Sequence, residues 1–142
     1  MENVFIKKVA SFFQTSLLGN DEMEDFLGLV GGKHSRVKNI ILRQNGIKTR
    51  YYALDKEHNT THTNAQMAAL AIDKLFDDVA EKEKVQVLTC GSSIPDQLLP
   101  SQASMVHGAA FKHPMEIFSL AGVCLSSLMA LKTAYMSILS NN

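Results

Sequence analysis

The sequence has little of what several classes of protein require. It contains no tryptophan, three prolines and two cysteines in 142 residues, and its 14 Lys and Arg balance its 14 Asp and Glu at a formal net charge of zero. A balanced chain lacks the excess positive charge that drives nucleic-acid binding or a polybasic membrane anchor, so we expect neither partner. Two cysteines are too few for a disulfide framework, which favours a reduced, cytoplasmic protein.

Long apolar runs are also missing. The longest uncharged apolar stretch, residues 117–131, is shorter than the ~20 residues of a membrane-spanning helix and contains serines. The apolar run after Lys7 and Lys8 is interrupted by polar residues, and no small-residue cleavage site follows it, so we expect no signal peptide. The hydrophobic fraction of 46% predicts a folded chain, and its length fits one domain over residues 1–142.

Hydrophobic periodicity predicts an alternation of strands and helices. A charged run at 81–84 is expected to be a solvated turn, and the small polar residues 90–93 are expected to form a loop. The expected strands are residues 4–13, 85–89 and 116–121, and the first of them is expected to be buried on both faces. The expected helices run from a cap at Asn20-Asp21 to Gly31-Gly32, from 63 to 79, from Pro100-Ser101 onward, and from 125 to 139. This order predicts an α/β fold with a mostly parallel sheet.

The last predicted helix is apolar on nearly every face. Cys124, Leu128, Leu131, Tyr135 and Ile138 follow one helical stripe, and other apolar residues cover most of the remaining surface. A helix of this kind is expected to be buried between layers. A chain of this length offers little material for such burial, so we expect either an incomplete chain or a partner.

Cys124 is the candidate nucleophile. It falls in a predicted tight turn, Gly122 to Cys124, between a strand and the apolar helix. A thiol at a helix N-terminus favours the thiolate, and the free N–H groups there can hold an oxyanion formed on an acyl carbon. The alternative is a cysteine that only packs, which is common because free cysteines are among the most buried residues.

The other candidates carry weaker signals. Cys90 and Ser92 follow a predicted strand, where a small polar loop can line a substrate site or simply be buried. His107 and His113 are the histidines nearest in sequence to Cys124. One of them is a candidate base, and the favoured alternative is a polar residue near the end of a helix. No histidine or cysteine spacing fits zinc, so no metal is expected. The basic residues between 36 and 50 can hold a phosphorylated ligand or form a solvated face.

Four segments carry a resemblance to a known family. The segment from Asn45 to Ala53 resembles the TGIxxRxxA signature of β-ketoacyl–acyl carrier protein synthase III, and the helix after Thr63 resembles the helix that follows it there. The segment from Leu99 to Ala103 resembles the start of a later family helix. The segment from Ala121 to Leu128 resembles the turn that bears the active-site cysteine. These motifs occur in the family's order across the whole chain.

The resemblance implies a thiolase-like layered fold, αβαβα, of which this chain corresponds approximately to the N-terminal half. Cys124 would take an acyl group from a coenzyme A or acyl carrier protein thioester. A malonyl-carrier protein would then lose CO₂, and the resulting carbanion would attack the acyl group. The family requires no cofactor for this reaction and forms dimers, so a homodimer or a complementary C-terminal half is the expected partner.

The sequence also departs from the family. In the family, the other catalytic residues are a His with an Asn or a second His. They lie in the C-terminal half, which has no counterpart in this sequence. Ile40 stands where many members carry an aromatic residue that stacks on adenine, which favours a carrier-protein donor. Arg50, Ile40 and Ser92 are the expected substrate-binding residues. Two other functions stay open, a hydrolase with a cysteine nucleophile and a non-catalytic interaction module.

Overall fold

The computed structural model describes residues 3–14 and 17–140, which form two compact units. The larger unit comprises residues 1–12 and 64–142, and the inserted unit comprises residues 13–63. Each is described by itself below. The expectation of a single thiolase-like domain over residues 1–142 stays a prediction.

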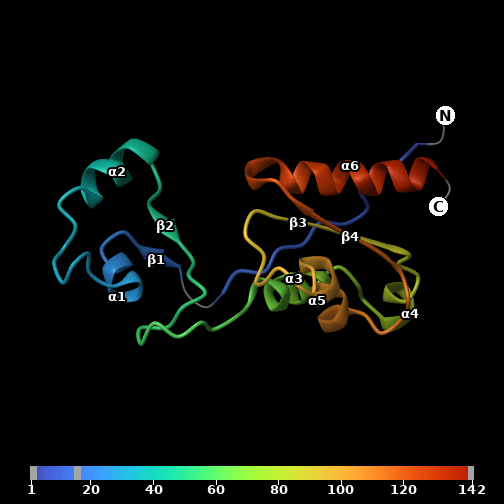
Figure 1. Cartoon of the computed structure of the whole chain (residues 1–142), viewed down its shortest axis with the longest axis horizontal. Helices are drawn as coiled ribbons and strands as arrows, with labels where there is room; N and C mark the ends of the chain where they lie inside the picture. Colours follow the sequence, from blue (N-terminus) through green and yellow to red (C-terminus); the bar gives the residue numbers. More distant parts are fainter. Residues whose placement is uncertain (1–2, 15–16, 141–142) are drawn as a thin grey trace. The chain divides into compact units, whose positions relative to one another are not determined.

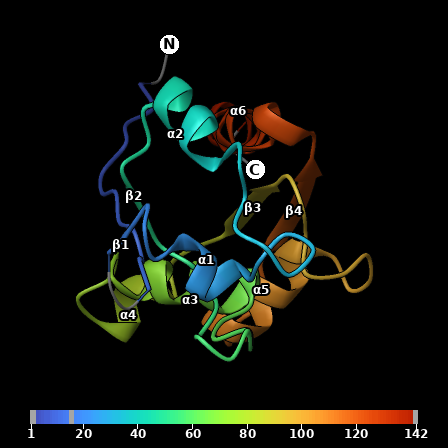
Figure 2. The same ribbon diagram turned by 90° about the vertical axis from the view of Figure 1, so that its left-hand side faces the viewer.

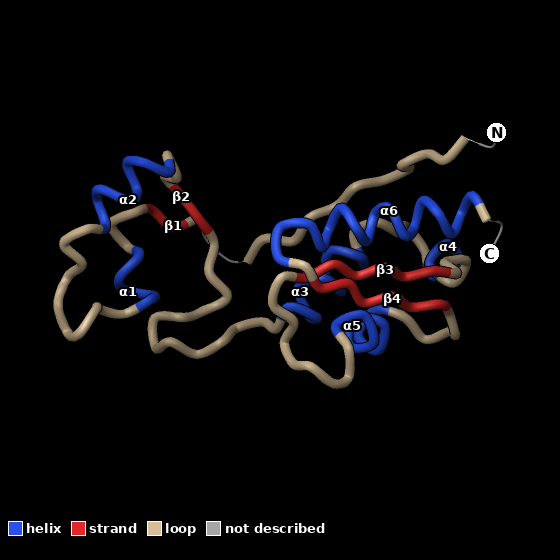
Figure 3. The backbone as a smooth tube through the Cα atoms, turned by 45° about the horizontal axis from the view of Figure 1, so that its top comes forward, coloured by secondary structure: helices blue, strands red, loops and turns tan. Residues whose placement is uncertain are grey.

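The larger unit has three layers, with two parallel strands in the middle layer and helices on either side. β3 (Val87–Ser92) pairs with β4 (Glu116–Ala121) in register from Val87 with Glu116 to Ser92 with Ala121. α6 (Ser126–Leu139) covers one face of the pair, and α3 (Asn64–Asp73) and α5 (Gln102–Ala110) cover the other (Figures 1 and 3). The chain runs β3, α5, β4, which is the βαβ crossover that a parallel pair requires. This confirms a mixed α/β architecture with a parallel pair.

The core of this unit lies between the strands and the helix pair α3–α5. Ala69, Ala110 and Phe111 are buried together, with Leu88 of β3 among the side chains packed against them. α5 begins as expected, because the Ser101 hydroxyl accepts a hydrogen bond from the N–H of Ser104 at 3.3 Å. Its expected inward residues Ala103, Val106 and Ala110 are all buried.

Two of the predicted boundaries in this unit are wrong. The helix predicted over 63–79 ends at Asp73, and a separate short helix, α4 (Val79–Lys82), follows it. Asp78 starts α4, since its carboxylate accepts the N–H of Glu81, so the charged run is partly helical rather than a turn. β3 continues to Ser92, and Cys90 and Ser92 therefore lie in the strand and not in the expected loop.

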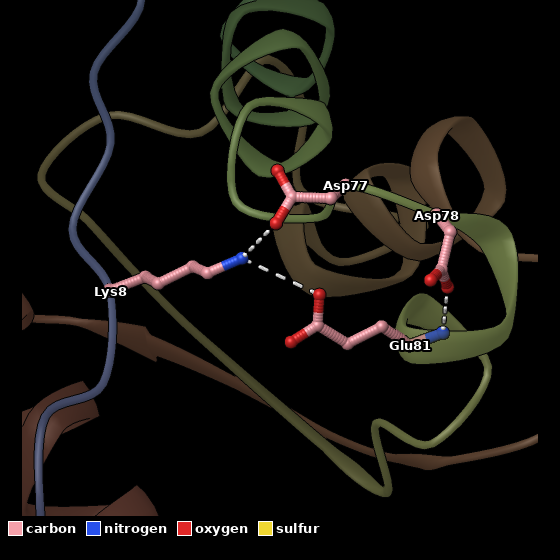
Figure 4. Close-up of polar contacts among 4 residues, drawn as sticks. All are labelled: Lys8, Asp77, Asp78 and Glu81. Atoms are coloured by element: carbon pink, nitrogen blue, oxygen red, sulfur yellow. Dashed lines mark hydrogen bonds and ion pairs between the residues drawn. The ribbon is translucent and has the colours of Figure 1, made fainter.

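The strand predicted over residues 4–13 is absent from the described chain. These residues pair with no strand, and Phe5, Ile6 and Val9 are exposed. Strand preference takes effect only where a neighbouring strand accepts the hydrogen bonds. One of its contacts is ionic: Lys8 Nζ lies 2.9 Å from an Asp77 carboxylate oxygen and 3.5 Å from a Glu81 carboxylate oxygen (Figure 4).

α6 is not buried as expected. Among its residues only Ser126 and Ala130 are buried, on the face that packs against β3 and β4. Leu128, Leu131 and Ile138 are each more than half exposed. β3 and β4 cover one face of this helix, whereas its sequence carries apolar residues on other faces as well.

The inserted unit contains short elements (Figure 2). β1 (Leu18–Gly19) pairs antiparallel with β2 (Thr49–Arg50), and the helices are α1 (Met23–Leu27) and α2 (Lys38–Asn45). α1 is shorter than predicted because Gly28, with φ of 78°, ends it before Gly31. The Asn45-Gly46 turn signal marks the end of α2, where Gly46 is left-handed and its N–H bonds to Leu42 O.

No helix of the described residues is long and apolar enough to cross a membrane.

Candidate functional site

Cys124 lies in the turn that leads from β4 into α6. A 3-10 turn spans Val123–Leu125, and α6 begins at the next residue. Cys124 is exposed. The expected strand–turn–helix placement is therefore present, with the cysteine in the turn just before the 14-residue helix rather than inside it. The sulfur is accessible to a reagent, and the helix's first N–H groups begin beside it.

Val123, the residue before Cys124, has a strained backbone. Its φ is 42°, in the left-handed region that β-branched residues rarely adopt. Such a conformation costs about 1–3 kcal/mol and persists only where the surroundings hold it. Two hydroxyls do so here: Ser93 Oγ donates to Val123 O at 2.7 Å, and Ser126 Oγ donates to the same oxygen at 3.0 Å.

The start of α6 also lies very close to β3. A side-chain carbon at Gly91 would overlap the Ser126 carbonyl and lie 2.8 Å from Ser127 N. Glycine at position 91 is therefore what allows the first turn of α6, and with it the Cys124 turn, to approach the strand.

Cys90 and Ser92 occupy β3, beside this turn. Burial raises the pKa of the Cys90 thiol, which keeps it protonated at neutral pH, as expected of a cysteine that only packs. The Ser92 hydroxyl donates to Ile94 O at 2.9 Å and so shapes the loop that follows the strand. Ser92 as a substrate-binding residue stays a prediction.

The two candidate histidine bases lie at the other end of the strands. His113 Nε2 is 2.7 Å from Val85 O, and His107 Nε2 is 2.9 Å from His113 O. Both positions precede the start of β4, whereas Cys124 follows its end. Six strand residues separate the two ends by roughly 15 Å or more. A histidine at this distance cannot take a proton from the Cys124 thiol, so neither histidine is its base.

Arg50 and Ile40 lie in the inserted unit. Arg50, at the end of β2, donates from Nη2 to Asn20 Oδ1 at 2.6 Å, while its buried Nη1 has no hydrogen-bond partner in the described part of the chain. Ile40 is on α2 and is 57% exposed. A cavity of about 460 Å³ in the same unit is lined in part by Asn20, Arg43 and Lys48.

Residues 3–14 and 17–140 contain no group of three or more His, Cys, Asp or Glu side chains that could hold a metal ion.

The sequence did not indicate several side chains that hold the backbone at the Cys124 turn or at the start of α3. Ser93 and Ser126 hold the Val123 carbonyl, and Asp96 accepts the first two amides of α3, Asn64 N at 2.7 Å and Ala65 N at 2.8 Å. The only signal was a run of small polar residues after β3, which indicates a loop but not its partners.

The fold of the chain is similar to that of a solved structure. Among solved structures, the chain is similar to AbyA1, a tetronic acid condensing enzyme, with 24% sequence identity and a TM-score of 0.74. The match covers 92% of this chain and 40% of AbyA1, so the chain spans less than half the length of that enzyme. At this identity the similarity establishes a related fold. No protein-family model and no curated protein matches the sequence.

Proposed function

We propose that this chain is the part of a thiolase-like condensing enzyme of the β-ketoacyl–acyl carrier protein synthase III type that carries the acyl-accepting thiol, Cys124. The observation that carries the proposal is the exposed cysteine in a strained turn between a parallel strand and a 14-residue helix. The fold shared with a condensing enzyme and the family-like segment from Ala121 to Leu128 support it.

The proposed first step is transfer of an acyl group between thiols. The Cys124 thiolate attacks the carbonyl carbon of a thioester, the carbonyl electron pair moves to oxygen, and collapse of the intermediate expels the donor thiolate. Backbone N–H groups at the start of α6 stabilise the oxyanion. In the second step, the carbanion formed when malonyl-carrier protein loses CO₂ attacks acyl-Cys124 and expels its thiolate. That step requires residues of a complementary C-terminal half.

The inserted unit supports an anionic donor. Coenzyme A and the phosphopantetheine arm of a carrier protein both carry phosphate, and Arg43 and Lys48 line the same cavity in that unit. Arg50, whose Nη1 is buried and unpaired in the described residues, and Ile40 on α2 are the further donor-binding residues in this proposal.

Replacing both Arg43 and Lys48 with alanine is expected to weaken donor binding by about tenfold while leaving alkylation of Cys124 unchanged.

The test is acylation of the purified chain. Incubated with an acyl-coenzyme A or an acyl-carrier protein, the chain is expected to gain the mass of one acyl group, which peptide mapping places on Cys124. Cys124→Ser is expected to abolish the gain. Cys90→Ala is the matched control and is expected to retain it, because the Cys90 thiol is half-buried with a raised pKa.

Two results contradict the proposal. Rapid hydrolysis of a simple ester, lost in Cys124→Ser, favours a hydrolase. Failure of both donors to acylate Cys124, together with alkylation no faster than that of a free thiol, favours a non-catalytic module.

A further inference from the structure

The peptide that joins Val123 to Cys124 is tethered by two serine hydroxyls. Ser126 is the first residue of α6 and lies three residues from Val123, whereas Ser93 comes from the loop after β3, 30 residues earlier. The Ser93 bond, at 2.7 Å, is the shorter of the two. Ser93 therefore connects the end of β3 to the turn that carries the cysteine.

This tether determines the direction of the next N–H group. A trans peptide is planar, with its C=O and N–H pointing to opposite sides. When the Val123 carbonyl is fixed toward Ser93 and Ser126, the N–H of Cys124 is fixed away from them. The φ of 42° at Val123 is unfavourable for valine, so the turn would relax toward another conformation if the carbonyl were released.

We propose that Ser93 is a positioning residue, whose hydroxyl acts through the Val123 carbonyl to direct the N–H of Cys124 toward the oxyanion formed during acyl transfer. This inference rests on the proposed function of Cys124. A hydrogen-bond donor whose direction is fixed before the reaction stabilises the developing negative charge without having to reorganise. Loss of the Ser93 hydroxyl therefore slows the step that forms the oxyanion more than it slows other reactions of the same sulfur.

The test compares three variants of the full chain with wild type. Ser93→Ala removes the hydroxyl, and Ser93→Thr keeps it. Ser137→Ala is the matched control, because Ser137 Oγ also donates to a backbone carbonyl, Thr133 O at 3.1 Å, but within α6 and away from the turn. Two rates are measured at Cys124: acyl transfer from a thioester, which passes through an oxyanion, and alkylation by iodoacetamide, which does not. Amide hydrogen exchange over residues 122–127 reports the turn itself.

In Ser93→Ala we expect acyl transfer to fall about tenfold, alkylation to change less than about twofold, and amide exchange in the turn to rise. Ser93→Thr is expected to restore acyl transfer, and Ser137→Ala to match wild type in all three measurements. Unchanged amide exchange in Ser93→Ala overturns the inference, as does an equal fall in acyl transfer and alkylation. If wild type takes no acyl group while exchange in Ser93→Ala still rises, the proposed function fails and Ser93 holds the turn for a structural purpose only.

Discussion

β3 and α6 lie very close together at Gly91, and alanine at this position would overlap the backbone of Ser126. We expect Gly91→Ala to lower the free energy of unfolding by about 1–3 kcal/mol, since backbone on both sides must move. The same movement displaces the Cys124 turn, so acylation of Cys124 is expected to slow as well. Urea unfolding and the mass-spectrometric acylation assay measure the two effects.

Gly108 provides the control for this prediction. It lies within α5, and a side-chain carbon there would meet nothing within 4 Å. Gly108→Ala is therefore expected to raise the free energy of unfolding by about 0.5–1 kcal/mol through helix propensity. A Gly91→Ala variant that unfolds with the same or a higher free energy than wild type, like Gly108→Ala, would show that β3 and α6 do not approach as closely as described.

The Glu24 carboxylate makes the stability of the inserted unit depend on pH. Hydrogen bonds from Lys38 Nζ at 2.8 Å, Ser35 N at 2.8 Å and the His34 ring at 2.9 Å lower the pKa of Glu24 from 4.5 to about 2. A carboxylate whose pKa is depressed by folding stabilises the fold above its ordinary pKa. This stabilisation is lost as the pH falls from about 4.5 to about 2.

We expect Glu24→Gln to weaken the protection of the Ser35 amide at neutral pH and to remove most of the change in protection between pH 4.5 and 2. Hydrogen exchange at Ser35, whose N–H donates to Glu24, measures this directly. Asp25→Asn, on the exposed side of the same helix, is expected to keep the wild-type pH dependence. A wild-type protein whose Ser35 protection does not vary over this range would contradict the assignment.

At the scale of elements, α6 has one packed face and broad exposed ones. Ala130 is 6% exposed against the strands, whereas its neighbour Leu131 is 54% exposed. We expect Ala130→Leu to cost about 1–3 kcal/mol through overpacking. Leu131→Ala is expected to cost less than about 1 kcal/mol, and urea unfolding of both variants measures the difference. The reverse order would place the packed face of the helix on the other side.

The elements that the sequence predicts well are those whose signals are local. β4 has the expected bounds, and α5 begins at its serine cap. The tight turn before α6 follows from Gly122 and the change of hydrophobic period after it. These features depend on residues within a few positions of one another.

The elements it predicts poorly depend on distant partners. The run 4–13 has strand-like composition but no neighbouring strand, and α3 stops at Asp73 although the apolar pattern continues to Val79. The tether from Ser93 to Val123 and the cap from Asp96 to α3 both cross about 30 residues. No periodicity encodes such contacts, so the placement of Cys124 was predictable and the residues that hold its turn were not.

At the scale of the whole molecule, the two proposed parts of the reaction belong to separate units. Cys124 lies in the larger unit, and Arg43, Lys48 and Arg50 lie in the inserted unit. The chain matches 40% of AbyA1. In the proposed function, the step that forms the carbon–carbon bond depends on residues of a complementary half.

We therefore expect the chain by itself to accept an acyl group but to form no carbon–carbon bond. Incubation with an acyl donor and malonyl-carrier protein, followed by mass spectrometry, is expected to show acyl-Cys124 and no β-ketoacyl product. Wild type without malonyl-carrier protein is the reference for acylation. A β-ketoacyl product formed by this chain alone would show that the complementary half is not needed.

The parallel register of β3 and β4 has a practical consequence for labelling. Both strands begin near His113 and end near the Cys124 turn, so the Cys124 thiol lies at the opposite end of the strand pair from His113. Lys112 is exposed and lies at the end of the pair where the strands begin. A fluorophore or an affinity tag attached there would report on the larger unit without crowding the thiol.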